Sequence, residues 1–290
     1  MTPSAASVPA TQLTLKDILF TTDFSEGSQH TLPYLRAIAK AFKSAVHLCH
    51  IEFPVPLAGP AVAPTIYEAT GKVMAERLTA LLNDPALRGL NLNLALGSGR
   101  IKDELLNIIR DRSIDLVVAG THGRAGFRKL LLGSVVEEII RVATCPVLIA
   151  GPSAVSRGEA PFKRILLPAG LNGASNKILP YVILFAKEFH AQVTVPHVRA
   201  KDEPGGNGAL RQSIEKSMME NLQPLLAFCK PEFVVETGDA AETILRVAHE
   251  RKIDLIAMGI KNRFAPGAQL RSSTAYRIMA GAECPVLTLR

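Results

Sequence analysis

The stretch that decides the fold is SIDLVVAGTHGRAGFRKLLLGS, at residues 113–134. It begins with an apolar, β-branched run typical of a buried strand, and that run ends at Gly120. Gly123 follows at a spacing that suits a tight turn and a close approach of the backbone to a ligand. Gly133 and Ser134 then begin a helix. A strand, a glycine-rich loop and a helix in this order present backbone N–H groups that can hold an anion.

The chain is an internal repeat, because the strand of that stretch recurs as KIDLIAMG at 252–259. TCPVLIA at 144–150 recurs as ECPVLTL at 283–289, with the same offset of 139 residues. KDILFTTD at 16–23 pairs with KRILLPAG at 163–170. Self-similarity of this kind indicates two copies of one module.

We expect the two copies to fold as domains over residues 15–150 and 162–290, which suits a chain of 290 residues. The linker between them, 151–161, is rich in Gly, Pro and Ser. Residues 1–14 are expected to form a flexible tail, because they have neither the basic start nor the apolar run of a signal peptide.

Each copy alternates short apolar runs with stretches of helical periodicity. This alternation predicts an α/β fold, with a mostly parallel sheet covered by helices on both faces. Right-handed crossovers make each sheet open and doubly wound. In the first copy the expected strands are 16–22, 45–52, 90–96, 115–120 and 146–150. The expected helices run from the cap residue Ser25 to residue 42, over 65–82, around 101–109 and over 134–143.

The composition excludes a largely disordered chain, because 48% of the residues are hydrophobic and 20% are charged. No apolar run approaches the roughly 20 residues that a membrane-spanning helix needs, so we expect a cytoplasmic protein. The cysteines form no CxxC pair, which indicates neither a zinc site nor a disulfide framework. Two of them, Cys145 and Cys284, occupy equivalent repeat positions before Pro and are expected to be buried, inert thiols.

Nucleic acid is not favoured as a partner, although the formal net charge is +7. The sequence has no dense run of Lys and Arg, no Trp and only 5% aromatic residues, whereas single-stranded nucleic acid is bound on aromatic platforms.

A ligand site is expected beyond the carboxyl ends of the strands, where the winding of an open parallel sheet reverses. Asp23 follows the first strand, and Gly120 ends the fourth. Arg124, Arg128 and Lys129 add positive charge to the glycine-rich loop. This combination suits a polyphosphate.

The loop carries the spacing G-x2-G-x9-G-S, and ILFTTDFS at 18–25 precedes it in the first copy. With HI after the second strand and CPVLI in the fifth, this pattern resembles the universal stress protein family. The likeness covers nearly all of 15–150 and returns, weakened, over 162–290, so the chain resembles a tandem universal stress protein. The residues of the motif are Gly120, Gly123, Gly133 and Ser134.

The resemblance implies a five-stranded sheet of order 3-2-1-4-5 in each copy. For the ATP-binding branch of the family it also implies ATP, with or without Mg²⁺, in the crevice. Asp23 would contact the ribose or adenine and Ile51 would line the adenine pocket, while the loop and the helix start would contact phosphates. The site residues implied in this way are Thr21, Asp23, Ile51, Ala119, Gly120, His122, Gly123, Arg124, Gly133, Ser134 and Val135. Thr21, in place of a frequent Pro, and Val136, in place of a hydroxyl residue, depart from the pattern.

The second copy breaks this motif. Gly170 stands in the place of Asp23, Asn262 in that of Gly123, and Ser272 in that of Gly133. Pro266 also removes a backbone donor. We therefore expect the second copy to keep the fold and to have lost nucleotide binding, with a different anion left open.

Structural explanations compete with these assignments. Asp23 can simply cap the following helix, and the glycine-rich loop can be an ordinary surface turn. His50 and His197 occupy equivalent repeat positions, which favours packing. His122 can be an acid or base, or can place the loop. The glycines at 97–99 make only a weak dinucleotide fingerprint.

Catalysis has little support. The sequence contains no G-x-S-x-G, HExxH or GxxxxGK[ST] motif. Residues 120–134 contain no Asp or Glu to position water or a metal, although Asp23 or Glu26 can lie near. Slow ATP hydrolysis is the most that this pattern indicates.

The leading hypothesis is a stress-response regulatory protein that holds ATP in its first domain, with the second as a structural partner. The resemblance implies that the two copies pair through their last strands, 146–150 and 285–289, which would cover an apolar edge. Two chains can then pair further as a homodimer. A weak ATPase or phosphoryl-transfer enzyme and a nucleotide-free protein-interaction module are the alternatives.

Overall fold

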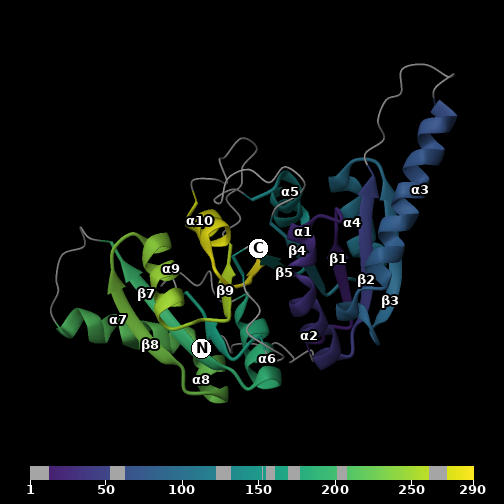
Figure 1. Cartoon of the computed structure of the whole chain (residues 1–290). Helices are drawn as coiled ribbons and strands as arrows, with labels where there is room; N and C mark the ends of the chain where they lie inside the picture. The colour runs from purple at the N-terminus through teal and green to yellow at the C-terminus, as the bar shows by residue number, and fades with distance from the viewer. Residues whose placement is uncertain are drawn as a thin grey trace, which may run out of the picture.

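A computed structural model describes residues 13–52, 63–121, 132–151, 153–154, 161–168, 177–200, 208–260 and 273–290. Within these ranges one ten-stranded sheet runs through the molecule, with helices packed against it (Figure 1). The chain therefore has the α/β fold that the alternating pattern predicts.

The strands follow the expected apolar runs closely. In the first half they are β1 (Asp17–Thr21), β2 (Ala45–Glu52), β3 (Asn91–Ser98), β4 (Leu116–Gly120) and β5 (Val147–Ala150). In the second half they are β6 (Arg164–Leu166), β7 (Gln192–Arg199), β8 (Glu232–Thr237), β9 (Leu255–Gly259) and β10 (Val286–Leu289).

The sheet has the order β3-β2-β1-β4-β5-β10-β9-β6-β7-β8, so each half follows its own third, second, first, fourth and fifth strand. Neighbouring strands within a half are parallel. The one antiparallel pair in the described ranges is β5 with β10, in which Leu148 lies opposite Leu287. Through this pair the sheets of the two halves continue into each other.

The helices connect these strands. Those of the first half are α1 (Glu26–Gln29), α2 (Leu32–Phe42), α3 (Ala63–Leu82), α4 (Ile101–Asp111) and α5 (Ser134–Val142), with a 3₁₀ turn at Pro85–Leu87. Those of the second half are α6 (Leu179–Phe189), α7 (Gly208–Asn221), α8 (Gln223–Phe228), α9 (Ala240–Glu250) and α10 (Thr274–Gly281). None of these helices is long and apolar enough to cross a membrane.

The helix expected from Ser25 to residue 42 is instead two helices, α1 and α2, and the single-helix prediction is wrong. Pro33 lies at the start of α2, where it has no N–H for the carbonyl four residues earlier. Thr31 precedes α2 and donates from its hydroxyl to the carbonyl of Ser28, 2.6 Å away. Because the chain turns between the two helices, the short α1 packs against the end of β4.

The core consists of two apolar layers, one on each face of the sheet, and each layer runs through both halves. On one face α2 meets α6, where the ring of Phe42 lies 5.9 Å from that of Phe185. On the other face α4 and α5 share a layer with α9 and α10. The central strands are apolar throughout because both of their faces are covered; Ile18 and Leu19 face opposite layers. The two halves therefore share their cores.

Candidate functional site

The predicted site lies where the strand order of the first half reverses, between β1 and β4. β1 pairs with β2 on one side and with β4 on the other. In this register Thr21 lies beside Ala119, so the segments that continue to Asp23 and Gly120 leave the sheet as neighbours. Thr21 is half-buried, and its hydroxyl lies 3.4 Å from the carbonyl oxygen of Val118. The carboxyl ends of two adjacent strands thus meet at the expected switch point.

Asp23 lies in the turn between β1 and α1, where it is half-buried. Its Oδ1 accepts a hydrogen bond from the backbone N–H of Ser25 at 3.0 Å and another from the Ser25 hydroxyl. Ser25 is in turn the N-cap of α1 and accepts from the N–H of Ser28 at 3.3 Å. The cap of α1 is therefore Ser25, as expected, and the alternative that Asp23 caps this helix is wrong; Asp23 supports the helix start only through Ser25. The bond from the backbone N–H of Ser25, which does not depend on the serine hydroxyl, holds the carboxylate in this turn.

His50 has the packing role that its repeat position favours. Its Nδ1 lies 2.7 Å from the carbonyl oxygen of Thr22, so the Nδ1–H donates there. Its ring lies 4.8 Å from that of Phe24, centroid to centroid, and Phe24 adopts a left-handed backbone with φ of 61°. The histidine thereby braces the turn that carries Asp23.

Ile51 lies near the carboxyl end of β2, opposite Gly97 of β3. A Cβ added at Gly97 would lie 3.5 Å from Cγ1 of Ile51 and 3.0 Å from Oε2 of Glu104. The side chain of Glu104 therefore packs over Gly97, beside Ile51. The sequence assigns Gly97 only to a weak dinucleotide fingerprint; its place beside Ile51 depends on strand register, which the sequence alone does not give.

Gly120 is required by packing, whatever its role toward a ligand. A Cβ at this position would lie 2.3 Å from the carbonyl oxygen of Gly27 and 2.9 Å from the Cα of Ser28. These are backbone atoms of α1, so no side-chain movement can relieve the clash. The close approach of α1 to the end of β4 explains the glycine without a phosphate.

The two ends of the glycine-rich loop are joined to each other. The N–H of Gly133 donates to the carbonyl oxygen of Thr121 at 2.7 Å, and the N–H of Thr121 donates to Ala150 at 3.1 Å. Residues 122–131, which include the predicted site residues His122, Gly123 and Arg124, lie outside the described residues.

The start of α5 is the part of the predicted phosphate site that the structure describes. Its N-cap is Gly133, which has no side chain, and among the described residues no side chain caps the helix. Ser134 and Val135 are exposed, whereas Val136 is buried in the core layer. A hydroxyl at position 136 would therefore face the core. The first-turn N–H groups of α5 have no intrahelical acceptors and lie at the positive end of the helix dipole. They can donate hydrogen bonds to an anion.

The start of α10, the equivalent helix of the second half, is different. Ser273 is its N-cap, and the Ser273 hydroxyl oxygen accepts from the N–H of Tyr276 at 3.1 Å. The replaced motif positions Gly170, Asn262 and Ser272 lie outside the described residues, as does Pro266.

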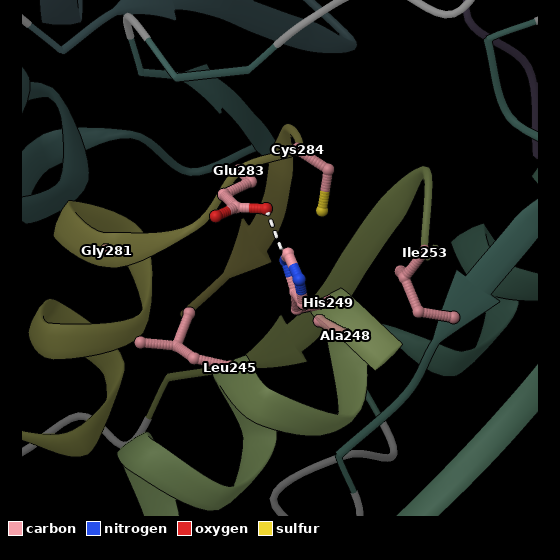
Figure 2. Close-up of a pocket in the computed structure, with 7 residues that line it drawn as sticks. All are labelled: Leu245, Ala248, His249, Ile253, Gly281, Glu283 and Cys284. Atoms are coloured by element: carbon pink, nitrogen blue, oxygen red, sulfur yellow. Dashed lines mark hydrogen bonds and ion pairs between the residues drawn. The ribbon is translucent and has the colours of Figure 1, made fainter. Parts of the chain in front are cut away.

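A cavity of about 80 Å³ lies in the second half of the chain, away from β1 and β4 (Figure 2). It is formed by α9, the end of α10 and the residues just before β9 and β10, so it lies at the amino ends of those strands. At its mouth Nδ1 of His249 lies 2.8 Å from Oε2 of Glu283. Because β10 is antiparallel to β5, these amino ends lie on the same edge of the sheet as the carboxyl ends of β4 and β5, but the cavity belongs to the second half.

The cysteines form no disulfide. Burial raises the pKa of the Cys49 and Cys145 thiols to about 12, which keeps them protonated at neutral pH. Cys284 is buried beside the cavity, whereas Cys145 is partly exposed. Within the described ranges no three His, Cys, Asp or Glu side chains gather as a metal site would need.

Comparison with known proteins finds one family over both halves. The sequence model of the Universal stress protein family matches residues 14–151 and 161–290. Universal stress protein MJ0531 of Methanocaldococcus jannaschii is 30% identical over 137 residues, which are 46% of this chain and 81% of that protein. Universal stress protein A homolog 1 of Coxiella burnetii is 31% identical over 143 residues, 46% of this chain and 94% of that protein.

A solved structure extends the likeness to the whole chain. A universal stress protein from Archaeoglobus fulgidus aligns with 94% of this chain and 98% of its own length, with a TM-score of 0.74 and 20% identity. That protein therefore has the same fold over both halves.

Proposed function

The chain belongs to the universal stress protein family, and we propose that it is a cytoplasmic stress-response regulator that binds an adenine nucleotide, ATP, in its first domain. The binding site comprises the carboxyl ends of β1 and β4 and the start of α5. The domains run over 15–150 and 162–290, with 151–161 as the linker. Two such chains pair further as a homodimer.

The observation that carries this proposal is the uncapped start of α5. Gly133 offers no side chain to the first-turn N–H groups, and Ser134 and Val135 are exposed. Such a helix start suits a phosphate. Gly120, His122, Gly123 and Arg124 complete the phosphate loop.

The other end of the nucleotide lies against β1 and β2. Asp23 binds the ribose or adenine edge, and Ile51 forms the wall of the adenine pocket with Ala119 behind it. Thr21 supports this wall from β1.

The second domain serves as a built-in pairing partner. Its β10 continues the sheet from β5, as a second subunit would in a dimer. Its own helix start is already capped by Ser273, so the donors that would meet phosphate are partly occupied.

Isothermal titration with Mg·ATP tests the proposal, with phosphate release followed in the same samples. We expect one site in each intact chain, lost in Asp23→Ala, without turnover. Ser25→Ala is the matched control, because it keeps the carboxylate and removes its hydroxyl contact; its affinity should stay within about twofold of wild type.

Two results would replace the proposal. Absence of binding at millimolar ATP would favour a protein-interaction module. Phosphate release well above that of a Gly123→Asp variant would favour an ATPase.

A further inference from the structure

Tyr276 of the second half contacts the end of the glycine-rich loop of the first half. This tyrosine belongs to α10, is 3% exposed, and points toward α5 of the first half. Its hydroxyl oxygen accepts a hydrogen bond from the backbone N–H of Leu132 at 3.1 Å. The two residues are 144 positions apart in the sequence, and the bond crosses between the halves.

Leu132 is the last residue before the Gly133 cap of α5. Its side chain is 3% exposed, so it is buried in the core. The next N–H, that of Gly133, is held by Thr121 of the same half. Two successive N–H groups at the end of the loop therefore have acceptors, one in the second half and one in the first. A buried N–H needs such a partner, because leaving it without one disfavours the structure.

The tyrosine stands where the repeat places a glutamate in the other half. The offset of 139 residues that relates the two motifs makes Glu137 of α5 the counterpart of Tyr276. The two side chains meet, with the Tyr276 hydroxyl 3.5 Å from Oε1 of Glu137. A glutamate at 276 would set two carboxylates against each other beside the proposed phosphate site. The uncharged phenol avoids this and supplies the acceptor for Leu132.

We infer that Tyr276 is a positioning residue for the nucleotide site of the first half. By holding the N–H of Leu132, it sets the end of the glycine-rich loop and the first turn of α5 against which phosphate binds. The second half, which has lost its own motif, thus completes the site of the first. This inference rests on the proposed function and goes beyond a passive pairing role.

Tyr276→Phe tests the inference, because it removes only the hydroxyl and keeps the buried ring. We expect its dissociation constant for Mg·ATP in the intact chain to rise about threefold to tenfold, the effect of one lost hydrogen bond. Amide hydrogen exchange at Leu132 and Gly133 should speed up in the ligand-free variant, while exchange in β1 and β7 stays unchanged. Tyr34→Phe makes the same chemical change in a buried ring on the other face of the sheet and should alter neither quantity.

The outcomes separate the two proposals. Equal ATP affinity in wild type and Tyr276→Phe, within experimental error, would overturn the inference and leave the proposed function standing. Faster exchange throughout the chain, with Tyr34→Phe weakening ATP equally, would reduce Tyr276 to a general packing residue and would also overturn it. Failure of the wild type to bind ATP would remove both proposals.

Discussion

The helices α5 and α10 hold the same place in the two halves, yet their first turns are completed differently. α5 begins behind Gly133, which has no side chain to cap it, whereas α10 begins behind Ser273, whose hydroxyl accepts from Tyr276. A capping hydroxyl uses the same backbone donors that would hold an anion. Both helices carry a serine at the equivalent position, Ser134 and Ser273, so the difference comes from where each helix begins: Ser134 is the first residue of α5, whereas Ser273 is the N-cap of α10.

The difference is local because everything around it is shared. Both halves have the same strand order, and the two apolar layers run from one half into the other. Because the core residues of the second half pack against those of the first, the core is shared, whereas the loop sequences of the two halves differ.

The largest effect should come from breaking the shared core. Phe185 of α6 is fully buried and lies against Phe42 of α2. Phe185→Ala should lower the free energy of unfolding by about 3–5 kcal/mol. Urea titration measures this loss, and amide exchange in β1 and β7 shows whether both halves open together.

Phe228→Ala is the control for this change, because Phe228 is 42% exposed and should cost less than about 1 kcal/mol. If Phe185→Ala speeded up amide exchange in β7 but not in β1, the halves would unfold independently, which would contradict a shared core.

A smaller effect is expected where the first half needs a glycine for packing. Gly120→Ala should destabilise the protein by about 1–3 kcal/mol, because its Cβ would meet backbone atoms of α1. Gly71→Ala, in a part of α3 with no atom within 4 Å of the added Cβ, should instead stabilise it by about 0.5–1 kcal/mol. Denaturant midpoints measure both. A neutral Gly120→Ala would mean that the ligand, rather than α1, accounts for this glycine.

The difference between the two helix starts can be tested by a Ser→Ala substitution at each of the two equivalent positions. Ser273→Ala removes the cap of α10 and should cost about 1 kcal/mol. Ser134→Ala, at the equivalent position of α5, removes no cap bond and should change the free energy of unfolding by less than about 0.5 kcal/mol. Equal losses in thermal or urea unfolding would show that the two helices do not differ in the way described.

The smallest effect concerns two thiols of the first half, Cys49 and Cys145. Because burial raises the pKa of Cys49 and Cys145 to about 12 from 9, the native state keeps protons that the unfolded state loses. Their contribution to stability is therefore complete below pH 9 and is lost between about pH 9 and 12. Both thiols should react slowly with iodoacetamide at pH 7.5 in the native protein and readily in urea, as mass spectrometry can determine. Fast native labelling of Cys49 would indicate an open first half.

The fold could be predicted from the sequence because its signals are local. The expected helix at 134–143 is observed as Ser134–Val142, and the expected strand at 45–52 as Ala45–Glu52. The break between α1 and α2 was missed, although Pro33 signalled it, because the apolar spacing from Leu32 to residue 42 suggested one continuous helix.

The site could be predicted only in part, because its finer features are tertiary contacts. The segments that continue to Asp23 and Gly120 leave the sheet as neighbours at a strand switch that topology rules foresee. The approach of Gly27 to Gly120 and the bond from Leu132 to Tyr276 depend on how distant segments pack, and no spacing in the sequence encodes them. Ser is a preferred N-cap, so the sequence does offer a signal for the cap by Ser273, but the motif comparison points to the neighbouring Ser272, which stands in the place of Gly133.

The measurement that tests the central claim most directly is the number of ATP sites in two variants with the same change at equivalent positions. Gly123→Asp places a carboxylate in the first-half loop, and Asn262→Asp places one in the second. Titration of the intact chains with Mg·ATP should give one site for wild type, none for Gly123→Asp, and one of unchanged affinity for Asn262→Asp. Two sites in the wild type, or a site lost in Asn262→Asp and kept in Gly123→Asp, would contradict the account.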